Sequence, residues 1–141
     1  MEYLYCKDDN FQDFASGRVL YGGKGIPNFP IRLLLEIYGR ALERSNKKED
    51  LVIYDPCCGG GYSLTILGYF QNKYIRKIYG SDIDEDMVAH AKKNISLLTV
   101  DLNSSIVHKE VLNMEILFIT SLTLSSLTSS KYLDNTLFII A

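Results

Sequence analysis

A short apolar run followed by an acid and three glycines is the segment with the clearest chemistry. The run, residues 51–54, leads into Asp55-Pro56-Cys57-Cys58-Gly59-Gly60-Gly61-Tyr62, and residues 56–61 are called the glycine turn below. Glycines allow the backbone to approach a ligand closely, and a helix that begins on such a turn offers unpaired N–H groups. The segment therefore predicts a site for one end of a nucleotide-type cofactor.

A second acid stands at the tip of the next predicted strand. Asp82 follows Gly59 by 23 residues, close to the roughly 20 residues at which an acid reaches ribose hydroxyls in nucleotide-binding folds. A glycine turn alone is more often a tight connection between a strand and a helix. Together with an acid on either side at this spacing, it indicates a cofactor site.

Two cofactors could use this arrangement. The dinucleotide fingerprint G-x-G-x-x-G lacks its third glycine here, since Leu64 occupies that position, and an acid, Asp55, precedes the turn. These details favour S-adenosylmethionine, and hence a methyltransferase, over NAD. An NAD-dependent oxidoreductase domain is the alternative.

The elements that must position these residues alternate between helix and strand. Asp84 is a good N-cap for the last helix, since Glu85 and Asp86 follow in its first turn, and Met87, Ala91 and Leu98 are expected on one face of that helix. The order predicts an α/β, Rossmann-like fold with a parallel sheet. The predicted helices are 30–44, 62–72 and 84–98, and the predicted strands are 51–55, 75–81, 116–122 and 137–140.

Length and composition predict one intracellular domain. The chain has 141 residues, a formal net charge of −2, no secretory signal pattern and no apolar stretch long enough for a membrane span. We expect a cytoplasmic protein with no membrane and no metal. Its three expected parts are a loop-rich arm (1–29), a cofactor-binding half (30–98) and a divergent tail (99–141).

Several polar residues have both a functional and a structural interpretation. Cys57 and Cys58 are expected to be small packing residues beneath the turn, because no neighbouring base would lower a thiol pKa. His90 and His108 are isolated in the sequence, and surface or hydrogen-bonded core positions are expected. The arm alternates cations with aromatic residues, which could contact phosphates and stack on bases, although a solvated arm explains them equally well. These residues are Arg18, Lys24 and Arg32, with Phe14, Tyr21 and Phe29.

Four segments of the chain resemble a known family. They are DFASGRVLY (13–21), PNFPIRL (27–33), DPCCGGGY (55–62) and SDID (81–84), within a region from about residue 11 to 98. This region is similar to the AviRa-type ribosomal RNA methyltransferases, which are linked to avilamycin resistance. The arm is the more specific part, since glycine turns of this kind occur across many methyltransferases.

The resemblance implies a Rossmann-like methyltransferase that takes the methyl group from S-adenosylmethionine and transfers it to a guanine of large-subunit ribosomal RNA. Carried over residue by residue, it places the ribose on Asp82 and the RNA or the cofactor against Arg18 and Arg32. Around the methionine end it places Asp55, Cys58, Gly59 and Gly61.

Past Leu98 we expect the resemblance to end. The chain has only Pro27, Pro30 and Pro56, so the proline-containing segment that holds the target base in many base methyltransferases has no counterpart after the second strand. We therefore expect an incomplete sheet in a truncated version of a longer enzyme. The alternative function is a non-catalytic fragment that binds the cofactor or RNA.

Overall fold

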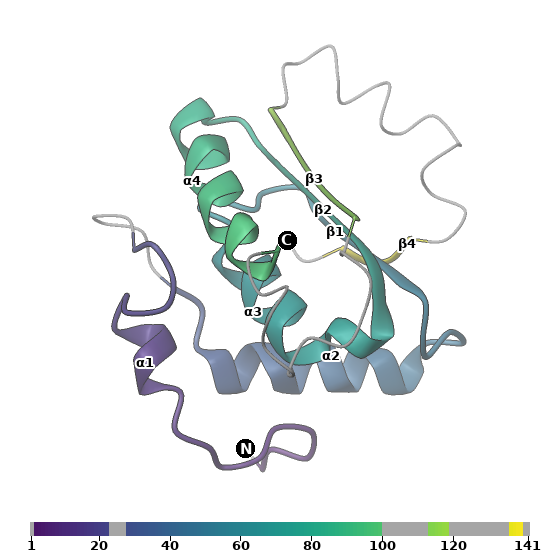
Figure 1. Ribbon diagram of the computed structural model, residues 1–141. Coiled ribbons are helices and arrows are strands. Elements are labelled where there is room, and N and C mark those ends of the chain that lie inside the picture. Colours follow the sequence, from purple (N-terminus) through teal and green to yellow (C-terminus); the bar gives the residue numbers. More distant parts are fainter. Residues whose placement is uncertain (1, 23–27, 100–112, 119–135, 140–141) are drawn as a thin grey trace.

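The chain forms a four-stranded parallel sheet with helices packed against it (Figure 1). The computed structural model describes residues 2–22, 28–99, 113–118 and 136–139. The strand order is β3-β2-β1-β4, so the two strands predicted with the site lie side by side at the centre. The strands are β1 (Leu51–Asp55), β2 (Ile75–Asp82), β3 (Asn113–Phe118) and β4 (Thr136–Ile139).

The register of the sheet brings the two acids to one edge. Asp55, the last residue of β1, pairs with Gly80 of β2, and Asp82 ends β2 two residues later. On its other side, β2 pairs with β3 up to Asp82 and Phe118. Because the strands are parallel, their carboxyl ends meet at the same edge, which is where ligands bind in open α/β sheets.

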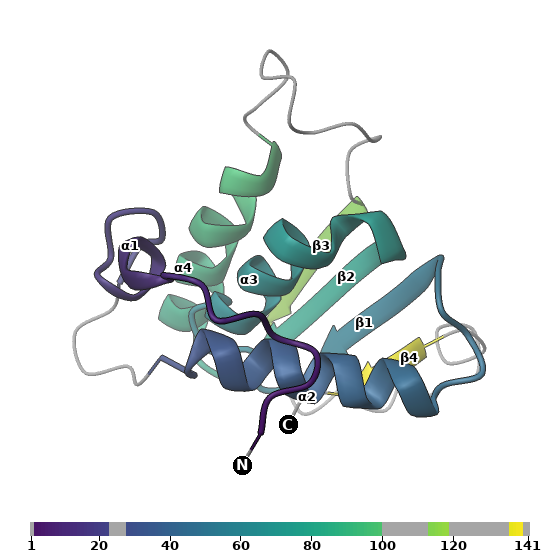
Figure 2. The same cartoon turned by 90° about the horizontal axis from the view of Figure 1, so that it is seen from below.

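Helices α2 (Ile31–Arg44), α3 (Tyr62–Gln71) and α4 (Glu85–Ser96) lie on the same side of the sheet (Figure 2). Short 3₁₀ turns, η1 (Asn72–Tyr74) and η2 (Leu97–Thr99), follow α3 and α4. The core between these helices and the sheet contains side chains with no exposed surface. They are Leu51, Ile53, Leu64, Ile66, Leu67 and Ile78.

The predicted elements agree closely with the observed ones. The apolar stripe expected on α2 is buried, and Asp84 caps α4 by accepting hydrogen bonds from the Asp86 and Met87 amides. The face predicted for α4 was partly wrong: Val88, Ala91 and Ile95 are its buried apolar residues, whereas Met87 is only half-buried. The tail strands are present, although β3 begins three residues before the predicted 116 and β4 one before the predicted 137. The parallel strands of the described residues fit the expected Rossmann-like fold.

The arm is ordered over its described residues and crosses all three helices. Near its start, the Tyr5 amide donates to the Glu36 carboxylate of α2 (2.8 Å). Its short helix α1 (Gln12–Ala15) contributes Phe14, which packs against Phe70 of α3 with ring centroids 5.2 Å apart. Further along, Leu20 is buried in the core, and Tyr21 hydrogen-bonds to α4. The arm therefore belongs to the folded domain.

Candidate functional site

The glycine turn connects β1 to α3 through two left-handed residues. Gly59 has a φ of +51° and Gly61 a φ of +72°, values that side-chain-bearing residues rarely adopt. The Gly61 amide closes the turn on the Cys58 carbonyl (2.9 Å), and Gly61 caps α3 without a side-chain hydrogen bond. The N-terminus of α3 therefore begins on bare backbone, whose partial positive charge favours a negatively charged group of a ligand.

Helix α4 supports the turn from beneath. A Cβ atom at Gly61 would lie 2.9 Å from the Ala91 Cβ, and one at Gly60 would lie 2.9 Å from the His90 Cδ2. Carbon atoms do not approach so closely, so a larger residue at Gly60 would displace the His90 ring, and one at Gly61 would collide with Ala91, whose Cα belongs to the α4 backbone. The turn thus needs glycine at Gly61 for both its conformation and its contact with α4.

Asp82 is joined directly to the glycine turn, as the sequence predicts. Its Oδ2 accepts a hydrogen bond from the Gly59 amide (2.8 Å), and its Oδ1 accepts one from the Asp84 amide (3.0 Å). The residue is only half-buried. Each carboxylate oxygen can accept more than one hydrogen bond, so Asp82 is oriented by the backbone and still able to accept from ligand hydroxyls.

Ser81 fastens the ends of the two central strands together. Its carbonyl accepts from the Cys58 amide (2.9 Å), and its Oγ lies 3.3 Å from the Pro56 carbonyl and 2.9 Å from the Tyr54 hydroxyl. The side chain is fully buried. This role of Ser81 was not predicted, because a single serine in a strand carries no signal of its partners on another strand.

Asp55 is a buried acid behind the turn. It is 5% exposed, and its Oδ1 accepts from the Cys57 amide (3.0 Å). Burial raises the pKa of Asp55 to about 6, with a further contribution from the nearby Asp82 charge, although the Cys57 hydrogen bond acts in the opposite direction. A cationic group placed beside Asp55 would therefore stabilise its charged form.

The raised pKa predicts a pH-dependent stability. Between pH 3.8, the ordinary value, and about pH 6, the unfolded state releases the Asp55 proton while the folded state keeps it. Stability that is present below this window is lost as the pH rises through about 6, by roughly 3 kcal/mol. Urea unfolding of wild type and Asp55→Asn between pH 4 and about 7.5 should show wild type losing stability relative to the variant. Parallel curves would contradict the raised pKa.

The two cysteines of the turn differ. Cys58 is buried, and burial raises the pKa of its thiol to about 12, which agrees with a packing role. The prediction for Cys57 was wrong, because this residue is exposed. The backbone explains the difference: the Cys57 amide turns back to Asp55, whereas the Cys58 amide pairs with Ser81.

Asn94 and His90 of α4 join the arm to the glycine turn. Asn94 is 1% exposed, and its Nδ2 donates to the Gly60 carbonyl (2.8 Å) and the Tyr21 carbonyl (3.2 Å). Its Oδ1 accepts from the Tyr21 amide (2.8 Å), and the His90 Nε2 lies 2.7 Å from the Tyr21 carbonyl. His90 is thus hydrogen-bonded, as expected, whereas the role of Asn94 was not predicted. His108 lies outside the described residues.

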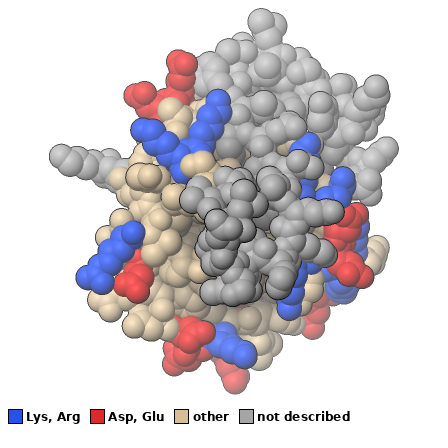
Figure 3. All heavy atoms as spheres, viewed as in Figure 1, with Lys and Arg blue, Asp and Glu red and all other residues tan. Residues whose placement is uncertain are grey.

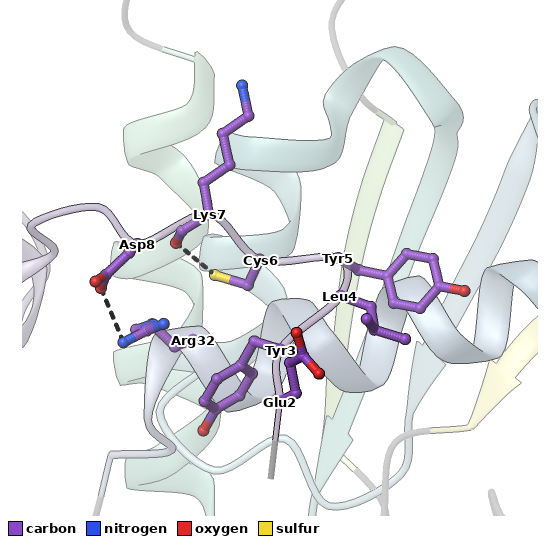
Figure 4. A pocket seen from close by; sticks show the side chains of 8 residues that line it. All are labelled: Glu2, Tyr3, Leu4, Tyr5, Cys6, Lys7, Asp8 and Arg32. Atoms are coloured by element: carbon purple, nitrogen blue, oxygen red, sulfur yellow. Dashed lines mark hydrogen bonds and ion pairs between the residues drawn. The ribbon is translucent and has the colours of Figure 1, made fainter.

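The arm cations are paired with acids. Arg18 is largely exposed and forms an ion pair with Asp13 (3.2 Å). Arg32, at the start of α2, pairs with Asp8 (2.9 Å) and lies over the Tyr3 ring. Figure 4 shows Arg32 beside an open cavity of about 610 Å³ that is otherwise lined by residues 2–8. The structure thus does not bring Arg32 to the glycine turn. Lys24 lies outside the described residues.

Other kinds of site find no support in the described residues. In this part of the chain, no helix is long and apolar enough to cross a membrane. Nor do its His, Cys, Asp and Glu side chains form a group of three that could hold a metal ion. Cations and acids are interspersed on the face shown in Figure 3.

Comparison with known proteins gives a consistent match. A family model described as rRNA methyltransferase AviRa matches residues 1–129. The expectation that the resemblance ends at Leu98 was therefore wrong, and the match also includes the start of the arm. A curated relative, the 23S rRNA (guanine(2535)-N(1))-methyltransferase of Streptomyces viridochromogenes, is 42% identical over 87 residues, which are 62% of this chain and 35% of the relative.

Two solved structures of the rRNA methyltransferase aviRa from the same organism share the fold. They superpose with TM-scores of 0.73 and 0.70, at 27% and 26% identity. Each match covers 88% of this chain and 64% of the solved chain. The chain thus spans less than two thirds of the length of these relatives.

Proposed function

Since the chain belongs to the AviRa family of rRNA methyltransferases, we propose that its glycine turn and Asp82 bind S-adenosylmethionine for methylation of a large-subunit ribosomal RNA base. One observation carries the proposal: the hydrogen bond from the Gly59 amide to the Asp82 carboxylate unites the two halves of the site. The family assignment replaces the oxidoreductase alternative.

Each end of the cofactor has a suitable environment. In this proposal Asp82, which the Gly59 amide orients, accepts the ribose hydroxyls, and Ile83, which is 84% exposed, offers an apolar surface to the adenine. The bare backbone at Gly59 and Gly61 receives the methionine end, with Cys58 packed beneath. Asp55 supplies the negative charge for the ammonium or sulfonium group.

The chemistry itself places modest demands on the protein. S-adenosylmethionine supplies a methyl group on an activated sulfonium, so the residues mainly hold the two reactants in line. The rigid strand ends, tied by Ser81, do this for the cofactor. The acceptor base must leave its stack to reach the methyl group. We assign no general base.

We propose large-subunit ribosomal RNA as the substrate and one of its guanines as the acceptor. The curated relative is by its name a guanine N1 methyltransferase of 23S rRNA. Arg18, which is largely exposed, is a candidate for phosphate contact if RNA displaces Asp13 from it. Arg32 is a weaker candidate, because Asp8 and Tyr3 already engage it. Cytoplasmic location follows from such a substrate.

A non-catalytic binding fragment is the second candidate. Both candidates share the cofactor site. They differ only in whether a methyl group is transferred.

Calorimetric titration of the full chain with S-adenosylhomocysteine tests the shared site. We expect S-adenosylhomocysteine to bind saturably to one site. In a separate assay that follows NADH fluorescence, we expect no binding of NADH. A folded protein that takes up no S-adenosylhomocysteine would contradict the proposal. Transfer of labelled methyl from S-adenosylmethionine to deproteinised large-subunit RNA then separates the enzyme from the binding fragment.

A further inference from the structure

Tyr21 combines a fixed backbone with an exposed ring. Both backbone polar groups of Tyr21 are hydrogen-bonded to the Asn94 side chain, and its carbonyl is also bonded to His90. The preceding residue, Leu20, is 4% exposed and anchors the chain in the core. Tyr21 is nevertheless 53% exposed.

The anchor of Tyr21 is also the anchor of the glycine turn. The Asn94 Nδ2 atom lies within 3.2 Å of the Tyr21 carbonyl oxygen and within 2.8 Å of the Gly60 carbonyl oxygen. The backbones of Tyr21 and Gly60 are therefore both hydrogen-bonded to the same Asn94 nitrogen atom. The backbone of Tyr21, which carries a half-exposed aromatic ring, is therefore held beside the Gly60 carbonyl of the glycine turn.

Exposed aromatic rings suit nucleic-acid bases. Every base has a π-face, and stacking of one base on an aromatic side chain contributes about 1–3 kcal/mol to single-strand binding. A tyrosine loses little conformational freedom when it stacks, because only two side-chain torsions are involved. A base that has left its helix needs a surface of this kind next to the methyl group.

We propose that the Tyr21 ring is a stacking surface for an RNA base beside the glycine turn, and that Asn94 is the positioning residue that holds it there. This inference rests on the proposed function and names a residue that would contact the RNA base.

Two variants test the Tyr21 ring and the Asn94 side chain separately. Tyr21→Ala removes the ring and keeps the backbone bonds, whereas Asn94→Asp keeps the side-chain shape and removes both donors.

The test measures binding of a fluorescein-labelled hairpin RNA with an unpaired loop guanine, by anisotropy with saturating S-adenosylhomocysteine and fixed salt. Tyr21→Ala is expected to weaken hairpin binding roughly tenfold, the size of one stack, and to leave S-adenosylhomocysteine affinity unchanged. Tyr21→Phe should bind within about twofold of wild type. The matched control is Tyr69→Ala on α3, because Tyr69 is as exposed as Tyr21, at 54%, but its ring packs on Phe14 and Phe70.

Asn94→Asp tests the positioning role. It should weaken hairpin binding about as much as Tyr21→Ala, and adding Tyr21→Ala in its background should cost less than about threefold more. A purely structural defect would instead leave the two effects additive. Circular dichroism at the assay temperature verifies folding. If Asn94→Asp is unfolded, the comparison of Tyr21→Ala with Tyr21→Phe tests the stacking role.

The outcomes distinguish this inference from the function on which it rests. Unchanged hairpin affinity in Tyr21→Ala, or an equal loss in Tyr69→Ala, would overturn the stacking role. So would a wild-type chain that binds S-adenosylhomocysteine but no hairpin, although the cofactor site would stand. A wild-type chain that binds neither ligand would overturn the proposed function itself.

Discussion

Asp82→Asn is expected to weaken S-adenosylhomocysteine binding by roughly 100-fold. Hydrogen bonds to a charged group contribute about 1.5–3 kcal/mol each. The variant loses the carboxylate that would accept hydrogen bonds from both ribose hydroxyls. The asparagine also has one acceptor oxygen for two backbone amides, those of Gly59 and Asp84. One of these amides then faces an NH₂ group. Calorimetric titration at about pH 7.5, where Asp55 is ionised, gives the affinity directly.

Asp84→Asn is the matched control for this loss of charge. Asp84 lies two residues further on and uses its Oδ1 to cap α4 through the Asp86 and Met87 amides. Asparagine caps a helix about as well as aspartate, so this variant should bind S-adenosylhomocysteine within about threefold of wild type. Equal losses in the two variants would mean that the local electrostatic field, and not the Asp82 contact, determines affinity.

Gly61→Ala is expected to destabilise the fold by about 3 kcal/mol. A residue with a side chain loses about 1–2 kcal/mol in the left-handed conformation that Gly61 adopts at φ +72°. Its new Cβ would also lie 2.9 Å from the Ala91 Cβ and 3.0 Å from its Cα, and such overpacking costs about 1–3 kcal/mol. Urea unfolding measures the sum, and cofactor affinity should fall with it because the turn must shift.

Gly59→Ala separates the two causes. Gly59 has a φ of +51°, and a Cβ there would meet nothing within 4 Å. This control should lose only the conformational part, about 1–2 kcal/mol. Ala91→Gly in the Gly61→Ala background should recover part of the remainder. If Gly59→Ala and Gly61→Ala are equally destabilised, the contact with α4 contributes nothing.

The parts of the fold that the sequence predicts are those with local causes. An apolar run that ends in Asp55-Pro56 and glycines can only be a buried strand entering a turn, and the Asp84 cap is specified within three residues. The meeting of Asp82 with Gly59 was also predictable, because parallel strands joined by one helix end at the same edge.

The unpredicted parts depend on partners that are distant in the sequence. Asn94 stands at a core-facing position of α4 where an apolar residue would be expected, and its contact with Tyr21 spans 73 residues. The Ser81 side chain reaches Pro56 across 25 residues. Cys57 and Cys58 are identical neighbours in the sequence, so only the path of the backbone decides which of them is buried.

The path of the arm has a consequence for the order in which this chain can fold. Its first residues leave the ribosome first, yet the bonds that hold it are made to Glu36, 31 residues beyond Tyr5, and to Asn94, 73 residues beyond Tyr21. Such distant contacts form late, because the loop they close must first lose its entropy. During synthesis the contacts of Tyr5 with α2 and of Phe14 with α3 can therefore form before α4 emerges, and Tyr21 is the part of the arm that is bound last.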